Sequence, residues 1–201
     1  MSIPYELKGR RRQKARTRGA LIEATRQLLA EGITPTVEQA AQRAEIARTT
    51  AYRYFANQNA LLLATYPELD ETSLLGSDPP ADPVARLDIV TEKVTRQILD
   101  HEPELRATLR LALGPDAPKT DGLPLRQGRV IRWIEDALSP LEGKLSEVEI
   151  HRLALAIRVS IGVEALVWLT GVGRLSRADA VATMRWSAQA LLDTAIRDVS
   201  E

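Results

Sequence analysis

Residues 48–54 read RTTAYRY and bring guanidinium, hydroxyl and phenol groups together within seven positions. Guanidinium groups bind phosphates and guanine edges, and hydroxyl groups bind phosphates and base edges, so this set of groups suits nucleic acid. Ala51 is the small apolar residue through which a helix here would pack, with its polar neighbours turned outward. The candidate contacts in this run are Arg48, Thr49, Thr50, Tyr52, Arg53 and Tyr54.

These residues lie in a tight helix pair within segment 36–61, TVEQAAQRAEIARTTAYRYFANQNAL. The pattern predicts one helix over 36–44 and a second over 48–54, joined by only three residues. Thr36 and Gln39 form a capping box that starts the first helix. The core beneath both helices is predicted to contain Val37, Ile46, Ala51 and Phe55. So small a pair cannot bury its apolar face alone, and a helix over 13–31 is expected to supply the third wall.

The segment resembles the N-terminal domain of the TetR (tetracycline-repressor-type) family of transcriptional regulators. The matching residues are Thr36, Ala41, Ala44, Ile46, Arg48, Thr50, Tyr52, Arg53, Tyr54, Phe55 and Leu61. The resemblance implies that the first three helices bind DNA, the fourth connects, and the others bind a small-molecule effector and form a homodimer. It also implies repression at a pseudo-palindromic operator in double-stranded DNA, with Thr36 and Gln58 completing the DNA-contacting set.

Three positions depart from the family pattern. Glu45 stands where the turn usually has glycine, so either a non-glycine residue accepts a positive φ or the turn geometry differs. Ala47 replaces the usual serine and removes one capping hydroxyl from the second helix. Gln58 replaces a lysine that commonly meets a phosphate, so a charged contact becomes a neutral one.

A basic segment precedes the helix pair, with seven cations between Lys8 and Arg18. As a disordered arm it could follow phosphates or enter a narrow minor groove, and the alternative is a solvated tail. Because the segment leads directly into a DNA-binding helix, we expect phosphate contacts from Arg10, Arg11 and Arg12.

Charge divides the 201-residue chain near residue 66. Residues 1–66 hold eleven Lys and Arg against five Asp and Glu, a net charge of +6, and residues 67–201 carry −6. We therefore predict a DNA-binding domain over 1–66 and an effector-binding and dimerisation domain over 67–201. No cysteine is present, which fits a reducing cytoplasm, and the expected DNA binding makes the protein nucleoid-associated. The most apolar window, 159–172, is interrupted by Glu164 and is not expected to span a membrane.

The fold predicted from periodicity and caps is all-α, with about nine helices. Asn57 caps a fourth helix, and Asp82 with Pro83 starts a fifth that runs to about 101. Further helices are expected over 103–113, around 130–138, from Ser146 to about 170, and from Ser176 to 199. Residues 114–124, GPDAPKTDGLP, are predicted to be a loop.

The second domain contains two sets of candidate residues. Effector contacts are Trp133 and Trp168, whose helices line the cavity by resemblance, and Glu164, which either faces a ligand or pairs with Arg158 or Arg185. Two C-terminal helices carry wider apolar stripes than one packing face needs, which indicates a dimer interface. The dimer residues are predicted to be Leu155, Val159, Gly162, Val163, Leu166, Ala182 and Trp186.

Enzymatic and metal-dependent functions find little support in the sequence. His101 and His151 lie fifty residues apart without a third ligand, and no catalytic framework or cofactor motif is present. We therefore expect no catalytic residue, no metal and no cofactor. Two alternatives remain: a helical interaction protein that has lost specific DNA binding, and a small helical enzyme that uses buried carboxylates such as Glu164.

Overall fold

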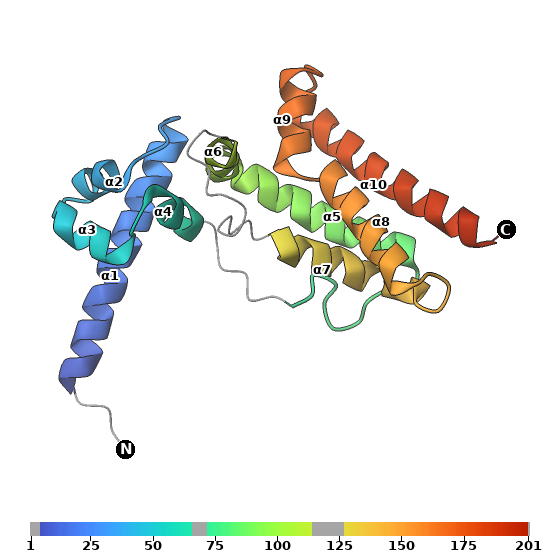
Figure 1. Cartoon of the computed structure of the whole chain (residues 1–201), viewed down its shortest axis with the longest axis horizontal. Helices are drawn as coiled ribbons and strands as arrows, with labels where there is room; N and C mark the ends of the chain where they lie inside the picture. The colour runs from blue at the N-terminus through green and yellow to red at the C-terminus, as the bar shows by residue number, and fades with distance from the viewer. Residues whose placement is uncertain (1–4, 66–71, 114–126, 201) are drawn as a thin grey trace. The chain divides into compact units, whose positions relative to one another are not determined.

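The computed structural model describes residues 5–65, 72–113 and 127–200 of the chain (Figure 1). Within these ranges the chain forms ten α-helices and one 3₁₀ helix, and no β-strand, which confirms the all-α prediction. The described residues group into two compact units, the first within 1–68 and 103–123 and the second within 69–102 and 124–201.

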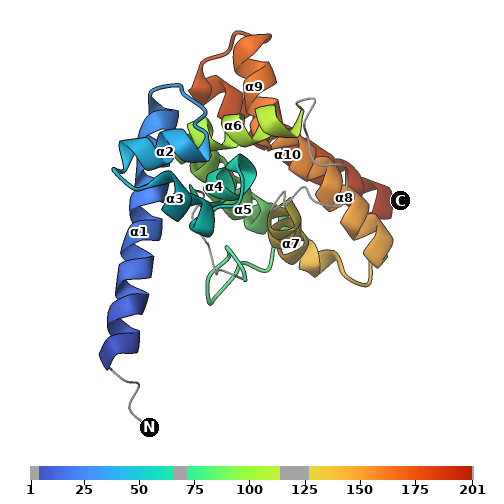
Figure 2. The ribbon, with the colours of Figure 1, turned by 60° about the vertical axis from the view of Figure 1, so that its left-hand side comes forward.

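The first unit contains the predicted helix pair and its supports (Figure 2). Its helices are α1 (Tyr5–Ala30), α2 (Val37–Arg43), α3 (Arg48–Tyr54), α4 (Gln58–Thr65) and, from Pro103, α6 (Glu102–Ala112). The buried core under α2 and α3 consists of Leu21, Ile22, Val37, Ala40, Ala41, Ala51, Phe55 and Leu61, with Ile46 packed against it. The predicted core residues are therefore confirmed, and the helix expected over 13–31 is the third wall.

Helices α1 and α2 end in the same backbone motif. At the end of α1, Ile33 N–H donates to the Leu28 carbonyl at 2.9 Å and Gly32 has a φ of +79°. At the end of α2, Ile46 N–H donates to the Ala41 carbonyl at 2.9 Å, and Glu45 has a φ of +55°. These are Schellman caps, which place the residue after the C-cap in the left-handed region. Glu45 thus accepts the positive φ, the first of the two alternatives for this turn.

The basic arm is not disordered over the residues that the structure describes. Helix α1 begins at Tyr5, eight residues before the predicted start at Gln13, so the backbone of Arg10, Arg11 and Arg12 is helical. Arginine, lysine and glutamine, which dominate this segment, all have high helix propensity. An extended backbone inserted into a minor groove does not match this conformation.

Helix α6 lies in the first unit from Pro103 onward, although the charge division placed it in the second domain. Ala107 is buried with Leu29 and Leu62, and Leu111 packs against them. Arg110 Nη1 donates to Thr34 Oγ1 at 2.9 Å. These contacts tie α6 to α1 and α4 within the first unit. The predicted loop over 114–124 lies outside the described residues.

The second unit is a helical bundle in which α10 packs against α5, α8 and α9, and α7 packs against α5 and α8. Its helices are α5 (Pro83–Asp100), α7 (Gln127–Leu138), η1 (Ser139–Leu141), α8 (Glu147–Ser160), α9 (Val163–Gly171) and α10 (Arg177–Ser200). The predicted caps are confirmed: Asp82 accepts from Val84 N–H at 3.2 Å, and Ser146 Oγ accepts from Glu149 N–H at 3.3 Å. The largest fully buried side chains here include Trp133, Leu138, Ile157, Leu166 and Met184.

The helix predicted from Ser146 to about 170 is in fact two helices, which accounts for the tenth helix. Helix α8 ends at Ser160, and Gly162 adopts an extended backbone (φ −79°, ψ 167°) as the N-cap of α9. A Cβ at Gly162 would lie 2.1 Å from Arg158 Nη1 and 2.2 Å from Glu164 Oε2, so the glycine leaves room for these two side chains. By length and composition Glu147–Gly171 could cross a membrane, with a mean hydropathy of 1.7. The structure instead divides the segment at Ile161 and Gly162.

We predict that Glu45→Gly stabilises the first unit by about 0.5–1 kcal/mol. A Cβ in the left-handed region costs roughly 1–2 kcal/mol, and the greater freedom of an unfolded glycine offsets part of that gain. The free energy of unfolding should be measured by denaturant titration. Glu45→Ala is the control, because it removes the same charge but retains the Cβ. If Glu45→Gly leaves the free energy of unfolding unchanged or lowers it relative to Glu45→Ala, the turn is not strained by its Cβ.

Candidate nucleic-acid interface

Helix α3 is anchored by its apolar face and carries its polar side chains outside. Ala51 and Phe55 are buried, whereas Arg48, Thr49, Tyr52 and Arg53 are exposed and Thr50 and Tyr54 are half-buried. Ala47 provides no side-chain cap, as the sequence predicted, and its carbonyl accepts from Thr50 N–H at 2.9 Å. Four exposed hydrogen-bonding side chains therefore share one short helix beside α2.

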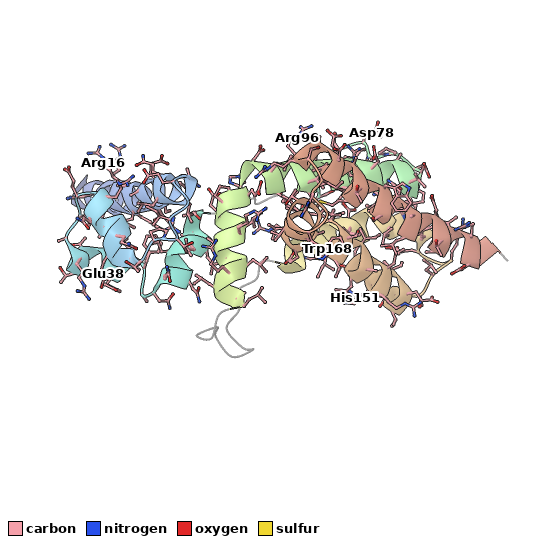
Figure 3. All side chains as sticks on the ribbon, turned by 90° about the horizontal axis from the view of Figure 1, so that it is seen from above. Arg16, Glu38, Asp78, Arg96, His151 and Trp168 are labelled. Carbon is pink, nitrogen blue, oxygen red and sulfur yellow. The ribbon has the colours of Figure 1, made fainter. Side chains whose placement is uncertain are left out.

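A carboxylate on α2 contacts two of these candidate groups. Glu38 Oε1 lies 2.6 Å from Arg48 Nη2 and accepts a hydrogen bond from the Tyr52 hydroxyl at 3.0 Å. The Arg48 guanidinium also lies over the Tyr52 ring, 5.7 Å from its centroid. Sequence reasoning missed Glu38, which Figure 3 labels, because an acid in the first turn of a helix is commonplace.

Thr36 and Gln58 have structural roles at the start of α2. Thr36 Oγ1 accepts from Gln39 N–H at 3.2 Å, and Gln39 Oε1 accepts from Thr36 N–H at 2.8 Å, which confirms the capping box. Thr36 is exposed, so its hydroxyl group is accessible to a further partner. Gln58 Nε2 donates to the Pro35 carbonyl at 3.0 Å. Gln58 therefore holds the chain just before the Thr36 cap, a role that was not predicted from its position, where the family commonly has a phosphate-binding lysine.

Further contacts fasten α2 and α4 to α1. Arg43 donates to both carboxylate oxygens of Glu31, at 2.7 and 2.8 Å. These hydrogen bonds lower the pKa of Glu31 and raise the pKa of Arg43. Arg26 donates through Nη2 to the Thr65 carbonyl at 2.7 Å. The helices that present the candidate groups are thus held by polar contacts as well as by the core.

The basic N-terminal part of α1 belongs to the same unit. Arg12, Lys14 and Arg16 are exposed, and Arg16 is labelled in Figure 3. The Arg18 guanidinium lies 5.6 Å from the centroid of the Phe55 ring, which connects this helix with the end of α3. The side chains of Arg10 and Arg11 lie outside the described part of the chain.

The candidate effector residues of the second unit do not converge on one described cavity. Trp133 is buried at 2% exposure, whereas Trp168 on α9 is 60% exposed. Glu164 lies 3.5 Å from Arg158, so the internal pair is the alternative that the structure favours for this carboxylate. Among the described residues no group of three His, Cys, Asp or Glu side chains could hold a metal ion, and His151 Nδ1 instead lies 2.6 Å from Glu135 Oε1.

The candidate dimer residues separate into two sets. Val163 and Leu166 are buried within the chain, at 6% and 0% exposure, as is Gly162, so these three serve the core of their own unit. The other four are exposed, namely Leu155, Val159, Ala182 and Trp186. The structure adds the exposed Val148, which lies seven residues before Leu155 and thus on the same face of α8.

The chain is similar to a known protein in its three-dimensional structure. No family model matches the chain, and no curated protein does. The solved structure of a TetR transcriptional regulator from Rhodococcus sp. RHA1 superposes with a TM-score of 0.53. The two sequences are 24% identical, and the match covers 90% of this chain and 97% of that chain. The chain therefore has the fold of a TetR transcriptional regulator.

Proposed function

We propose that this protein is a sequence-specific regulator of transcription that binds double-stranded DNA through α3. The observation that carries the proposal is the presentation of Arg48, Thr49, Tyr52 and Arg53 on an anchored helix after a tight turn. A recognition helix of this kind enters the major groove, where its side chains reach base edges. The Rhodococcus regulator supports this assignment through its shared fold.

Phosphate contacts would come from the basic N-terminal part of α1 and from the start of α2. Arg10, Arg11 and Arg12 lie on the N-terminal part of α1, and Thr36 can donate its hydroxyl proton to a phosphate oxygen. As a helix, this part of α1 would follow the phosphate backbone. The N-terminal part of α1 is therefore proposed to contact phosphates as a helix and not to enter the minor groove as an extended arm.

The second unit is proposed to bind an effector and to join two copies of the chain. Val148, Leu155 and Val159 form an exposed apolar stripe on α8, and Ala182 and Trp186 lie one turn apart on α10. A symmetric dimer through α8 and α10 would cover these side chains and place two α3 helices on a pseudo-palindromic operator. A small apolar or amphipathic effector would release the operator by changing the spacing of the two DNA-binding units. Such a protein is a cytoplasmic repressor without catalytic activity.

Trp133, Glu164 and Trp168 enter this proposal unequally. Trp168 is exposed and could meet a ligand directly, whereas Trp133 is in the core and could do so only if the bundle opens. Glu164 would have to leave Arg158, at the cost of one part-exposed ion pair. Trp168 is therefore the best of the three as a reporter of effector binding.

We predict that the protein enriches one sequence from a random duplex library, with an affinity that falls steeply with salt. Replacing Arg10, Arg11 and Arg12 with Gln should weaken binding and flatten the log–log salt slope by about one unit for each phosphate that is no longer neutralised. The matched control replaces the exposed Arg132, Lys144 and Arg197 of the second unit with Gln, and its slope should equal that of wild type. Failure to enrich any sequence would favour the helical interaction protein instead.

We predict a homodimer in solution, with about twice the 22.2 kDa mass of one chain. Val159 is 74% exposed, so Val159→Glu should leave the fold of the monomer intact and still dissociate the dimer, because a charge buried without a partner is costly. Sedimentation at micromolar concentration measures both masses. Leu113→Glu is the control, since Leu113 is 77% exposed but lies in the first unit. A wild-type mass near that of one chain would refute the two-half-site arrangement.

A further inference from the structure

Glu38 contacts Arg48 and Tyr52, two of the side chains that the proposed function assigns to DNA binding. Its Oε1 atom lies 2.6 Å from Arg48 Nη2 and accepts from the Tyr52 hydroxyl at 3.0 Å. All three side chains are accessible: those of Glu38 and Arg48 are 40% and 71% exposed, and Tyr52 is 40% exposed. Any DNA that reaches Arg48 and Tyr52 therefore meets a carboxylate beside them.

The direction of the hydrogen bond limits what Tyr52 can bind. A phenol has one proton, and an ionised carboxylate can only accept, so the Tyr52 proton is committed to Glu38. The Tyr52 oxygen then has only lone pairs to offer a further partner. Phosphate oxygens are acceptors and cannot donate to it. In the major groove, the adenine N6 amino group and the cytosine N4 amino group can each donate a hydrogen bond to this oxygen.

The ion pair also changes what Arg48 gains from DNA of any sequence. One edge of the guanidinium faces Glu38, which places a negative charge beside the cation and would repel a nearby phosphate. A guanidinium has five N–H donors, so others remain for the N7 and O6 atoms of guanine. Arg48 thus loses part of its attraction for phosphate but keeps its capacity to read a base.

We propose that Glu38 is a specificity-determining residue that acts through Tyr52 and Arg48. It makes the Tyr52 hydroxyl an acceptor for the amino group of adenine or cytosine, and it weakens the attraction of Arg48 for phosphates. Glu38 is a positioning residue, and the bases are read by its two partners. The inference rests on the proposed DNA-binding function and adds a division between base-reading and phosphate-binding groups.

The test compares two duplexes at one salt concentration: the sequence enriched by the wild-type protein and a scrambled version of it. Tyr52→Phe should weaken binding to the enriched duplex about three- to tenfold and change the scrambled duplex by less than about twofold, because a single neutral hydrogen bond is removed. Glu38→Ala should strengthen binding to the scrambled duplex about threefold or more and lower the ratio of the two affinities. Glu23→Ala, which removes an exposed carboxylate from α1, should leave that ratio unchanged. Thermal melts check that each variant is folded.

The results that would overturn the inference can be told apart from one another. Equal weakening of both duplexes by Tyr52→Phe would show that the hydroxyl donates to phosphate, and no weakening of either would show that it does not contact DNA. An unchanged affinity ratio for Glu38→Ala would remove Glu38 from recognition. Each of these results overturns the inference and leaves the DNA-binding function standing. If the wild-type protein enriches no duplex, the proposed function fails and the inference fails with it.

Discussion

The helix–turn–helix depends on the backbone reversal at Glu45. Its positive φ of 55° lets Ile46 N–H reach the Ala41 carbonyl, so only three residues separate the C-cap of α2 from the first residue of α3. This register puts Ala51 in the core and the neighbouring polar side chains outside. A non-glycine residue in this conformation costs roughly 1–2 kcal/mol, and burial of the apolar residues that follow offsets that cost.

Features set by neighbouring residues could be predicted from the sequence. The capping boxes at Thr36 and Ser146 and the Asp82 cap all depend on side chains that reach backbone groups two or three residues away. The missing side-chain cap at Ala47 could be predicted for the same reason, because alanine has no hydrogen-bonding side chain. The helix pair was predictable for this reason, because its turn, caps and small core lie within one short segment.

Features set by distant residues could not be predicted. The apolar run through Ile161 and Gly162 has the periodicity of one helix, and its pattern does not show that the helix breaks at Gly162, where the Arg158 and Glu164 side chains leave no room for a Cβ. The packing of Ala107 with Leu29 and Leu62 joins segments that charge alone had separated. Glu38 could be placed on its helix, but its partners Arg48 and Tyr52 follow only from the geometry of the turn.

The charges of the first unit show how binding and selectivity would be divided. Two of its acids are paired with cations of the helix pair, Glu31 with Arg43 and Glu38 with Arg48, so the positive charge near α2 and α3 is largely balanced. The exposed cations of α1 have no such balance in the sequence, because residues 7–22 contain no acid. Under the proposed function, α1 would therefore supply the sequence-independent attraction to DNA, and α3 would contribute through the geometry of its contacts. A recognition helix whose Arg48 is already paired with a carboxylate of the neighbouring helix gains less from the phosphates of a wrong sequence, and that lower gain is itself a source of specificity.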